Sequence, residues 1–500
     1  MNSSDISPSK DAKKFYITSP IFYQNGELHI GHAYTMIMCD IFARFHKLMG
    51  EHTYFLTGAD ENSNKIDRTA ASRGVEVQPF LDEMSDKFKK LYEDIGASYD
   101  QFIRTSDEKK HWPGAIKMWN KLVDAGDIYK SAYKGYYCPE CEAFYTEKDL
   151  MEGKCPLHHI VPQVIEEENY FFKLSRFTAS IKAAIESGEL EIMPVARKNE
   201  ILSLLNSGLQ DVSFSRPAKT LGRGIPVPGD DSQIIYVWCD ALVNYISALG
   251  YGSGDGEEST GDVSGDGKLF TEFWPADVHV IGKDILRFHA AIWPGMLLSA
   301  GLPLPKRILV HGLIMSGGKK MSKSIGNTIA PETILSEYGR EALRYYFARH
   351  IPIFDDGEMT MEIFHDSYNA GLANGIGNLT NRIMKMAETY LKEPVVSMES
   401  PLGNTLPESF IAAFEKFDIN AATNIIWQEI AAMDGLIQES QPFKLVKENP
   451  EKGEQIIRDL VIRLYTIGRM LNPILPETSE KIKAAVKSNK MPEEALFLRK

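Results

Sequence analysis

Near the start of the chain, two short runs of hydrophobic residues flank a segment in which hydrophobic residues recur with the period of a helix. Residues 15–18 and 53–57 are brief aromatic and β-branched runs, which are typical of buried strands. Between them, apolar side chains from about residue 32 recur three and four positions apart, and this predicts a helix that ends near Gly50. A strand, a helix and a second strand in close succession make a βαβ unit. The pattern therefore predicts a parallel sheet covered by helices.

Three later runs of strand-forming residues, at 234–238, 278–282 and 307–315, indicate that the α/β core resumes further along the chain. A segment around residues 135–160 separates them from the first strands, and it is too polar to build a large core of its own. From about residue 358 the pattern is helical throughout. We therefore expect an α/β core split by an insertion and followed by an all-α domain. The expected boundaries are 1–115, 116–230, 231–357 and 358–500.

Composition excludes several classes of protein. The 500 residues are 43% hydrophobic and 25% charged, as in ordinary globular proteins rather than disordered or collagen-like chains. The formal net charge is −13, which argues against indiscriminate nucleic-acid binding, although residues 366–500 carry only −2 of it. The polar N-terminus predicts no secretory signal, and no apolar run is long enough to span a membrane. Residues 249–268, rich in Gly, Ser, Asp and Glu, are interpreted as a surface loop without chemistry.

Two histidines flank a glycine where the first predicted helix begins, in His29-Ile30-Gly31-His32. A helix N-terminus at the carboxyl end of a parallel strand offers unpaired N–H groups to phosphate. Gly31 permits close approach of the backbone, and the imidazoles can donate hydrogen bonds to phosphate oxygens as charge builds up. The alternative is a pair of ordinary histidines at a helix cap.

A loop of lysines and hydroxyl groups follows two glycines, in Gly317-Gly318 and Lys320-Met321-Ser322-Lys323-Ser324. Such a loop suits a clamp on a polyphosphate, in which lysines offset the charge of a leaving pyrophosphate. It is not a Walker A loop, because the required spacing of Gly, Lys and Ser or Thr is absent. Taken alone, it is more typical of a solvated basic loop.

Three of the five cysteines lie close together in the polar segment. Cys138 and Cys141 form one knuckle, and Cys155 and His158 form a second that begins 14 residues after Cys141. Three thiolates and one imidazole can close a tetrahedral zinc site, and a closed site is structural because it leaves no position for substrate. We expect one zinc ion per chain, with His159 as the rival ligand to His158. Reduced cysteines of this kind favour a cytoplasmic protein.

The histidine and lysine motifs together are similar to the HIGH and KMSKS signatures of class I aminoacyl-tRNA synthetases. The surrounding segments narrow the resemblance to the methionyl-tRNA synthetase family. These segments are TSPIFYQNGELHIGHAYT, FIRTSDEKKHW, ENYFFKLS, YVWCDALVNYI, VIGKDILRFH and HGLIMSGGKKMSKSIGN, which lie between about residues 14 and 345. The resemblance implies a Rossmann-like catalytic core, a zinc-knuckle insertion and a helical anticodon-binding domain.

The same resemblance implies activation of L-methionine by ATP, with Mg²⁺, and transfer of the methionyl group to methionine tRNA. The implied catalytic residues are His29, His32, Lys320 and Lys323, and the implied ATP-binding residues are these four with Gly31, Ser322 and Ser324. The implied methionine-binding residues are Ile21, Tyr23, Asp60, Trp238, Ala241, Tyr245, Ile285, Phe288 and His289. Asp60 would pair with the substrate ammonium. Without the resemblance, Trp238, Ile285 and Phe288 would be interpreted as core residues.

In the helical domain the resemblance implies three anticodon-binding residues, Asn378, Arg382 and Phe443. Asn378 and Arg382 lie four positions apart and so share one face of a helix. Phe443 stands where the family has a stacking Trp, and Asn62-Ser63 and Cys239 are two further departures from the family pattern. We expect weaker stacking of an anticodon base on Phe443.

Two other classes of function remain open on sequence alone. One is another class I synthetase, for leucine, isoleucine, valine or cysteine, although the first three typically carry a longer inserted domain than residues 116–230 allow. The other is a non-catalytic tRNA-binding relative, against which the intact signatures argue. We expect a monomer, since some relatives dimerise through a C-terminal module that this sequence lacks.

Overall fold

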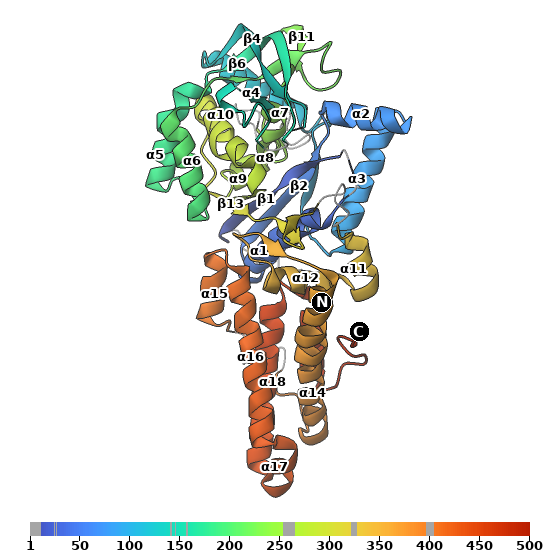
Figure 1. The fold of residues 1–500 in the computed structure, drawn as a ribbon. Coiled ribbons are helices and arrows are strands. Elements are labelled where there is room, and N and C mark those ends of the chain that lie inside the picture. Colours follow the sequence, from blue (N-terminus) through green and yellow to red (C-terminus); the bar gives the residue numbers. More distant parts are fainter. Residues whose placement is uncertain are drawn as a thin grey trace.

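The computed structural model describes residues 12–24, 26, 28–140, 143–145, 147–156, 159–253, 266–321, 328–396 and 405–500. Within these residues, an α/β body stands on a long group of helices (Figure 1). The helical part comes from the C-terminal third of the chain and projects away from the α/β body. No described helix combines the length and apolar character needed to cross a membrane.

A six-stranded parallel sheet forms the centre of the α/β body, in the order β3-β2-β1-β12-β13-β7. Its strands are β1 (Lys14–Tyr23), β2 (His52–Asp60), β3 (Gln101–Arg104), β7 (Glu191–Met193), β12 (Val278–Gly282) and β13 (Arg307–His311). The chain builds outward from β1 to β2 and β3 on one side, and returns as β12 and β13 on the other. The strand order therefore reverses between β1 and β12. In open parallel sheets, ligands bind outside the carboxyl ends of the strands at this point.

Helices cover both faces of the sheet. On one face lie α1 (Ile30–Leu48) and α3 (Val77–Asp94), and on the other lie α4 (Trp112–Asp124) and α10 (Trp293–Ala300). The body also contains α2 (Asn64–Arg73), α5 (Thr178–Ser187), α6 (Val195–Ser207), α7 (Val237–Leu242), α8 (Asn244–Ser247), α9 (Lys268–Phe273), α11 (Pro331–Tyr338) and α12 (Arg340–His350).

Smaller sheets flank the central one. An antiparallel sheet in the order β5-β4-β6-β8 contains β4 (Ile128–Cys138), β5 (Ala143–Tyr145), β6 (Gln163–Phe172) and β8 (Val212–Ser213). A second contains β9 (Ser215–Pro217), β10 (Pro226–Val227) and β11 (Asp230–Ile235). A third joins β14 (Ile314–Ser316), β15 (Lys319–Lys320) and β16 (Gly357–Glu358). The first two lie between β3 and β12 in the chain, so the core is interrupted and then resumed.

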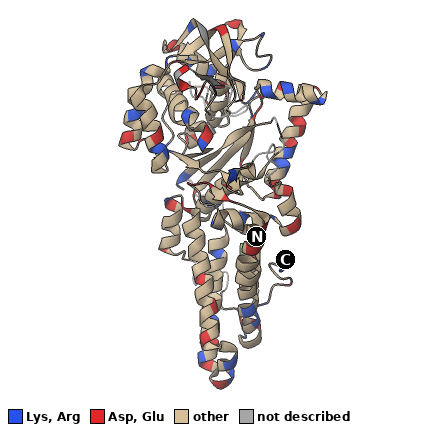
Figure 2. Ribbon diagram, viewed as in Figure 1, with Lys and Arg blue, Asp and Glu red and all other residues tan. Residues whose placement is uncertain are grey.

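The C-terminal part of the described chain is helical. Its elements are α13 (Met361–Ser367), a π-helical segment η5 (Tyr368–Gly377), α14 (Asn378–Tyr390), α15 (Glu408–Glu415), α16 (Ile419–Ser440), α17 (Pro442–Glu448), α18 (Pro450–Leu471) and α19 (Pro476–Ser488). Acidic and basic segments are interspersed along these helices (Figure 2). The structure confirms the predicted parallel α/β core followed by an all-α domain.

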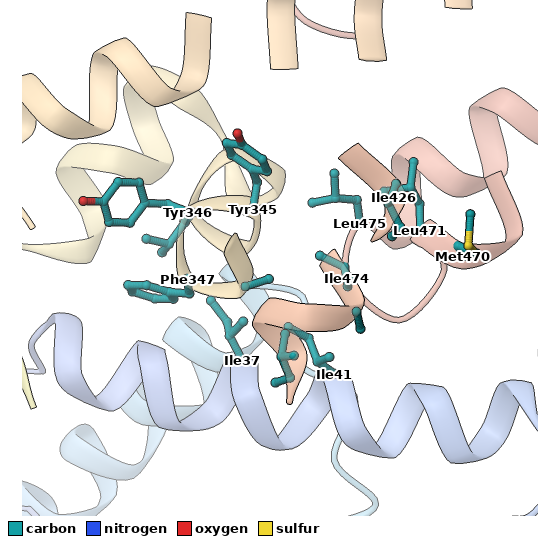
Figure 3. Close-up of a cluster of buried hydrophobic side chains, with 14 of the residues drawn as sticks. Ile37, Ile41, Tyr345, Tyr346, Phe347, Ile426, Met470, Leu471, Ile474 and Leu475 are labelled. Atoms are coloured by element: carbon teal, nitrogen blue, oxygen red, sulfur yellow. The ribbon is translucent and has the colours of Figure 1, made fainter. Parts of the chain in front are cut away.

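Helix α1 connects the two parts. Its Ile37 and Ile41 belong to a buried cluster shared with α12 and with the turn after α18 (Figure 3). The Phe45 ring stacks on Phe414 of α15 at 4.2 Å between ring centres. The helix that carries the histidine motif at its start thus packs against the helical domain through its second half.

Three predicted elements differ from the structure. The first helix begins at Ile30 rather than near residue 32, because the His29 side chain caps it. The predicted strand at 234–238 ends at Ile235, and Val237 already begins α7. The predicted strand at 307–315 divides after His311, because the Gly312 N–H donates to the Ile353 carbonyl at 2.9 Å rather than to a strand of the central sheet. Of the predicted 249–268 loop, residues 254–265 lie outside the described residues.

Candidate active site

The two histidines of the first motif cap helix α1 reciprocally. The Gly31 N–H donates to His29 Nδ1 at 3.1 Å, and the His29 N–H donates to His32 Nδ1, also at 3.1 Å. A backbone N–H can only donate, so both Nδ1 atoms accept, and the neutral imidazoles carry their protons on Nε2. The two rings lie 3.9 Å apart. A Cβ at residue 31 would meet the His29 ring at 3.0 Å, which explains the glycine. The motif thus offers two Nε2–H donors at a helix N-terminus.

The start of α1 contacts the end of β13. Thr35 Oγ1 lies 3.1 Å from the Gly31 carbonyl oxygen and 3.0 Å from His311 Nε2. The Thr35 hydroxyl donates to the Gly31 carbonyl, and His311 Nδ1 donates to the Gly312 carbonyl at 2.7 Å. Burial lowers the pKa of His311, which keeps the ring neutral. The lysine motif follows β13 in the chain. The Thr35–His311 contact therefore holds the segment that leads to the lysine motif against the start of the helix that carries the histidine motif.

A tight hairpin precedes the lysine loop. Gly317 and Gly318 connect β14 to β15, with φ angles of 63° and 69°. Two successive positive φ angles are typical of the type I′ turn that favours two-residue hairpins. The Glu358 carboxylate of β16 accepts from both glycine N–H groups, the second at 3.1 Å. The backbone of Lys320 ends this hairpin, whereas Ser322, Lys323 and Ser324 lie outside the described residues.

Three of the expected methionine-binding residues meet at the carboxyl ends of β1 and β2. Tyr23 pairs with Asp60 in the parallel register, and Ile21 pairs with Gly58. Asp60 is 3% exposed, so its carboxylate is withdrawn from bulk water. A cation drawn into such a site would find a partner of opposite charge.

An aromatic stack contributes two more of these residues. The rings of Trp238 in α7 and Phe288 lie 3.7 Å apart and nearly parallel, at 8°. Both side chains are partly exposed and pack on the same buried cluster as Ile21, Tyr23 and Ile285. Ala241 is buried one helical turn after Trp238. The Trp238 indole N–H is buried and has no acceptor among the described residues.

The remaining two residues, Tyr245 and His289, are joined by a buried hydrogen bond. His289 Nδ1 donates to the Ile285 carbonyl at 3.0 Å, so its Nε2 accepts from the Tyr245 hydroxyl at 2.7 Å. Burial lowers the pKa of His289 to about 4, and the ring is neutral at pH 7. The His279 ring of β12 lies 4.2 Å from the Tyr245 ring, and its Nδ1 lies 2.8 Å from Thr18 Oγ1 of β1. These groups lie at the point where the strand order reverses.

The departures from the family pattern have structural roles. Asn62 is 2% exposed and donates to Asp240 in α7 at 2.8 Å, which links the end of β2 to the helix that carries Trp238. Ser63 caps α2 by accepting from the Lys65 N–H at 3.2 Å. Cys239 is buried in the core, where burial raises the pKa of its thiol.

Sequence reasoning missed several supporting residues. His111 Nε2 contacts Asp240 at 2.6 Å, through the carboxylate oxygen that Asn62 does not bind, and its Nδ1 contacts Ser247 of α8 at 2.8 Å. His279 and His311 were missed as well. The segments FIRTSDEKKHW, YVWCDALVNYI and HGLIMSGGKKMSKSIGN contain three of these residues, His111, Asp240 and His311, so the motifs already carried a signal.

Two of the four expected zinc ligands are brought together. Cys138, at the end of β4, and Cys155 are both 0% exposed and share a small buried cluster with Tyr145. The Tyr145 hydroxyl lies 3.6 Å from Cys155 Sγ. Cys141 and His158 lie outside the described residues. His159 is exposed and has a left-handed φ of 55°.

The three expected anticodon residues lie on α14 and α17 of the helical domain. Asn378 is exposed at the start of α14, and Arg382, one turn later, forms an ion pair with Asp434 of α16. Phe443 is 41% exposed in α17. The Tyr390 hydroxyl, at the end of α14, lies 3.5 Å from the Phe443 carbonyl oxygen, so Arg382 stands about 12 Å along the helix from that contact.

The comparisons with known proteins identify the family. The model of the family described as "tRNA synthetases class I (M)" matches residues 15–161 and 148–384. A methionine–tRNA ligase of Clostridium acetobutylicum is 41% identical over 95% of this chain and 73% of its own length. The chain belongs to the methionyl-tRNA synthetase family. Another member, from Thermotoga maritima, is 39% identical over 94% of this chain and 74% of the relative.

Solved structures of methionyl-tRNA synthetases share the whole fold. The Mycobacterium tuberculosis enzyme in complex with methionyl-adenylate matches with a TM-score of 0.85 and 33% identity, over 94% of this chain and 93% of that one. Its apo form matches with a TM-score of 0.80 and 30% identity, over 98% of both chains. The likeness therefore covers the α/β body, the inserted sheets and the helical domain together.

Proposed function

We propose that this chain activates L-methionine with ATP and transfers the methionyl group to the 3′ end of methionine tRNA. In the first step, a carboxylate oxygen of methionine attacks the α-phosphorus of ATP and pyrophosphate leaves. In the second, a terminal ribose hydroxyl of the tRNA attacks the methionyl carbonyl and AMP leaves. The observation that carries the proposal is a 41% identity to a methionine–tRNA ligase that extends over 95% of the chain.

Catalysis rests on positioning and charge stabilisation. The Nε2–H groups of His29 and His32 would donate to ATP phosphate oxygens, since their Nδ1 atoms are occupied by the helix cap. Lys320 and Lys323 would offset charge on the leaving pyrophosphate. Gly31, Ser322 and Ser324 would complete the ATP site. Mg²⁺ bound to ATP supplies further neutralisation of the phosphates.

Methionine recognition would combine one charge contact with an aromatic pocket. Asp60 would pair with the substrate ammonium at the strand ends. Trp238 and Phe288 would contact the thioether, which gains from sulfur–ring contacts. The Tyr245 hydroxyl donates to His289 and is therefore fixed in orientation. Discrimination rests mostly on shape, because the methionine side chain has no strong hydrogen-bonding group.

A structural zinc ion fits the inserted sheets. Cys138 and Cys155 come from segments 17 positions apart in the chain and are buried in the same cluster, as two thiolate ligands require. Cys141 and His158 would complete a tetrahedral set. Zinc at such a closed site cross-links the chain, which a small sheet without a large core needs.

The tRNA would be read by the helical domain. Asn378 and Arg382 offer an amide and a guanidinium on one helix face, and Phe443 offers an exposed ring on which a base can stack. Two lysines, Lys444 and Lys447, accompany Phe443 in α17. We also propose that the chain works as a monomer in the cytoplasm.

Pyrophosphate exchange distinguishes the proposed function from the two alternatives, another class I synthetase and a non-catalytic tRNA-binding protein. The measurement follows ATP–pyrophosphate exchange with each of methionine, leucine, isoleucine, valine and cysteine. Exchange that depends on methionine alone supports the proposal. Exchange with another amino acid would favour a sister synthetase, and no exchange at all would favour a tRNA-binding protein without catalysis.

A further inference from the structure

A cavity of about 350 Å³ lies in the helical domain, outside every site discussed above. Its walls come from the end of α12, from η5 and from the middle of α16. That volume is in the range of small-ligand pockets. Leu379, which follows Asn378 in the chain, and Asp434, which pairs with Arg382, both line the cavity. The cavity therefore continues from the surface on which we expect tRNA.

An irregular helix builds the cavity wall. In η5 the backbone is π-helical, and Gly375 departs from helical geometry with φ −86° and ψ −108°. π-Helical turns are frequent at functional sites. A Cβ on Gly371 would lie 1.8 Å from the Tyr345 hydroxyl, so only glycine fits there. The Gly371 carbonyl accepts from the Trp427 indole N–H at 3.1 Å, and this hydrogen bond holds the Trp427 ring in the cavity wall against η5.

The cavity presents a cation that is not neutralised. The Arg349 guanidinium lies 5.0 Å from the centre of the Trp427 ring and donates to the Tyr345 hydroxyl at 2.8 Å. Over the part of the chain that the structure describes, no carboxylate is within ion-pair distance of Arg349. Asp434, the acidic group of the wall, is already paired with Arg382. An anion entering the cavity would meet Arg349 without displacing a partner.

The other polar groups of the wall are uncharged. Asn374 is exposed in η5 and offers an amide donor and acceptor. Loss of hydration and the charge of Arg349 lower the pKa of His350 to about 4, so its imidazole is neutral at pH 7. One guanidinium beside neutral amide and imidazole groups suits a ligand with a single negative charge and a planar, hydrogen-bonding body. A nucleotide unit of a nucleic acid has this composition.

We propose that this cavity takes one unpaired nucleotide of the bound tRNA, with its phosphate on Arg349 and its base edge at Asn374. The proposal rests on the proposed function, because it names a further contact with the same tRNA. This nucleotide is additional to the bases expected at Asn378, Arg382 and Phe443. The position of the cavity on the helical domain favours a tRNA nucleotide over a free mononucleotide.

Substitution of the guanidinium tests the proposal. Arg349→Gln should raise the KM for methionine tRNA about ten-fold, because a phosphate contact is lost, and Asn374→Ala should raise it less. Arg349→Lys should recover much of the affinity. The salt dependence of tRNA binding should also weaken, by about 0.7 in the slope of log K against log salt, because one phosphate is no longer neutralised. A role in folding alone would not change that slope.

A control variant and an assay without tRNA distinguish a failure of this proposal from a failure of the proposed function. Arg73→Gln removes another guanidinium that lies over a ring, Phe80, outside the helical domain, and gives the effect of losing one charge in general. Methionine-dependent pyrophosphate exchange without tRNA should be unchanged in Arg349→Gln. If exchange is intact but the tRNA KM and salt slope of Arg349→Gln match those of Arg73→Gln, the proposal is wrong. Saturable binding of uridine monophosphate that depends on Arg349, with an unchanged tRNA KM, would identify a free mononucleotide instead and overturn it.

Discussion

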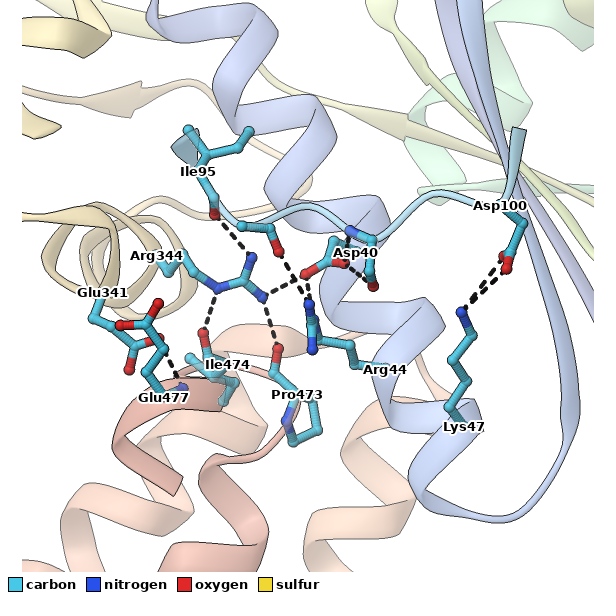
Figure 4. Close-up of polar contacts among 12 residues, drawn as sticks. Asp40, Arg44, Lys47, Ile95, Asp100, Glu341, Arg344, Pro473, Ile474 and Glu477 are labelled. Atoms are coloured by element: carbon cyan, nitrogen blue, oxygen red, sulfur yellow. Dashed lines mark hydrogen bonds and ion pairs between the residues drawn. The ribbon is translucent and has the colours of Figure 1, made fainter. Parts of the chain in front are cut away.

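Arg344 of α12 forms an ion pair of 2.7 Å with Asp40 of α1, and both side chains are 0% exposed (Figure 4). The same guanidinium donates to the carbonyl oxygens of Ile474 at 2.8 Å and Pro473 at 3.0 Å, in the turn between α18 and α19. Burial alone would raise the pKa of Asp40, but the charges of Arg344 and Arg44 hold it below its ordinary value. One arginine thus joins the motif helix α1 to the helical domain.

Removal of this arginine should destabilise the protein. Arg344→Met leaves a buried carboxylate with one cation fewer and removes the donor to three backbone carbonyl groups, those of Ile95, Pro473 and Ile474, which should cost about 3 kcal/mol of unfolding free energy. Arg44→Met is the matched control, since Arg44 also pairs with Asp40 at 2.7 Å but is 23% exposed, and its cost should be smaller. Urea unfolding of both variants measures the difference. Equal midpoints would show that the buried pair does not stabilise the junction.

Acid should destabilise the protein partly through His289. An unfolded histidine binds a proton near pH 6.5, whereas burial lowers the pKa of His289 to about 4 in the folded state. Between these values the unfolded chain binds more protons, so stability falls as the pH falls, by about 1.4 kcal/mol per pH unit for this group. In His289→Gln, unfolding measured from pH 7.5 to 5 should show a shallower slope, and the difference should grow as the pH falls and approach that amount only near pH 5. Above pH 7.5 the wild-type protein and His289→Gln should show the same slope of unfolding free energy against pH. Equal slopes over the whole range would contradict the lowered pKa of His289.

The aromatic stack should govern the affinity for methionine. Trp238→Ala removes the ring that stacks on Phe288 at 3.7 Å, and should raise the KM for methionine in pyrophosphate exchange about a hundred-fold while the KM for ATP changes little. Phe443→Ala removes an exposed ring from the helical domain and should leave both constants unchanged. A parallel rise of both KM values in Trp238→Ala would indicate a general packing defect instead.

The buried cysteines should retain zinc. Metal analysis of the purified protein should find one zinc ion per chain that survives dialysis, and Cys155→Ser should lose it because a thiolate ligand is replaced by a poor one. Cys39→Ser, a buried cysteine of α1 outside the inserted sheets, should keep the metal. A zinc-free wild-type protein would remove the assignment.

The sequence predicted the strands and helices that follow a regular hydrophobic pattern. The prediction was wrong where contacts with distant segments determine the local secondary structure. Residues 234–238 look like a strand, yet Trp238 lies in a helix because Asp240 is held by Asn62 and His111 from other segments. A helix cap and a phosphate site were both open for His29 on sequence alone, because histidine is not a usual N-cap residue and propensity does not decide between them; the structure shows the cap. The motifs indicated which residues belong to the site. The pairing of Tyr23 with Asp60 and of Trp238 with Phe288 required the register of the sheet and the packing of α7.

The central claim is that the histidine and lysine motifs act on one ATP molecule, and single-turnover formation of methionyl-adenylate tests it most directly. His32→Ala and Lys323→Ala should each slow the step by about 10²- to 10³-fold, because each removes a donor that stabilises developing phosphate charge. Lys319→Ala, an exposed lysine of the same hairpin outside the motif, is the control and should keep the wild-type rate. Methionine binding, measured by equilibrium dialysis, should be the same in all four proteins. A wild-type rate of adenylate formation in either His32→Ala or Lys323→Ala would contradict the account.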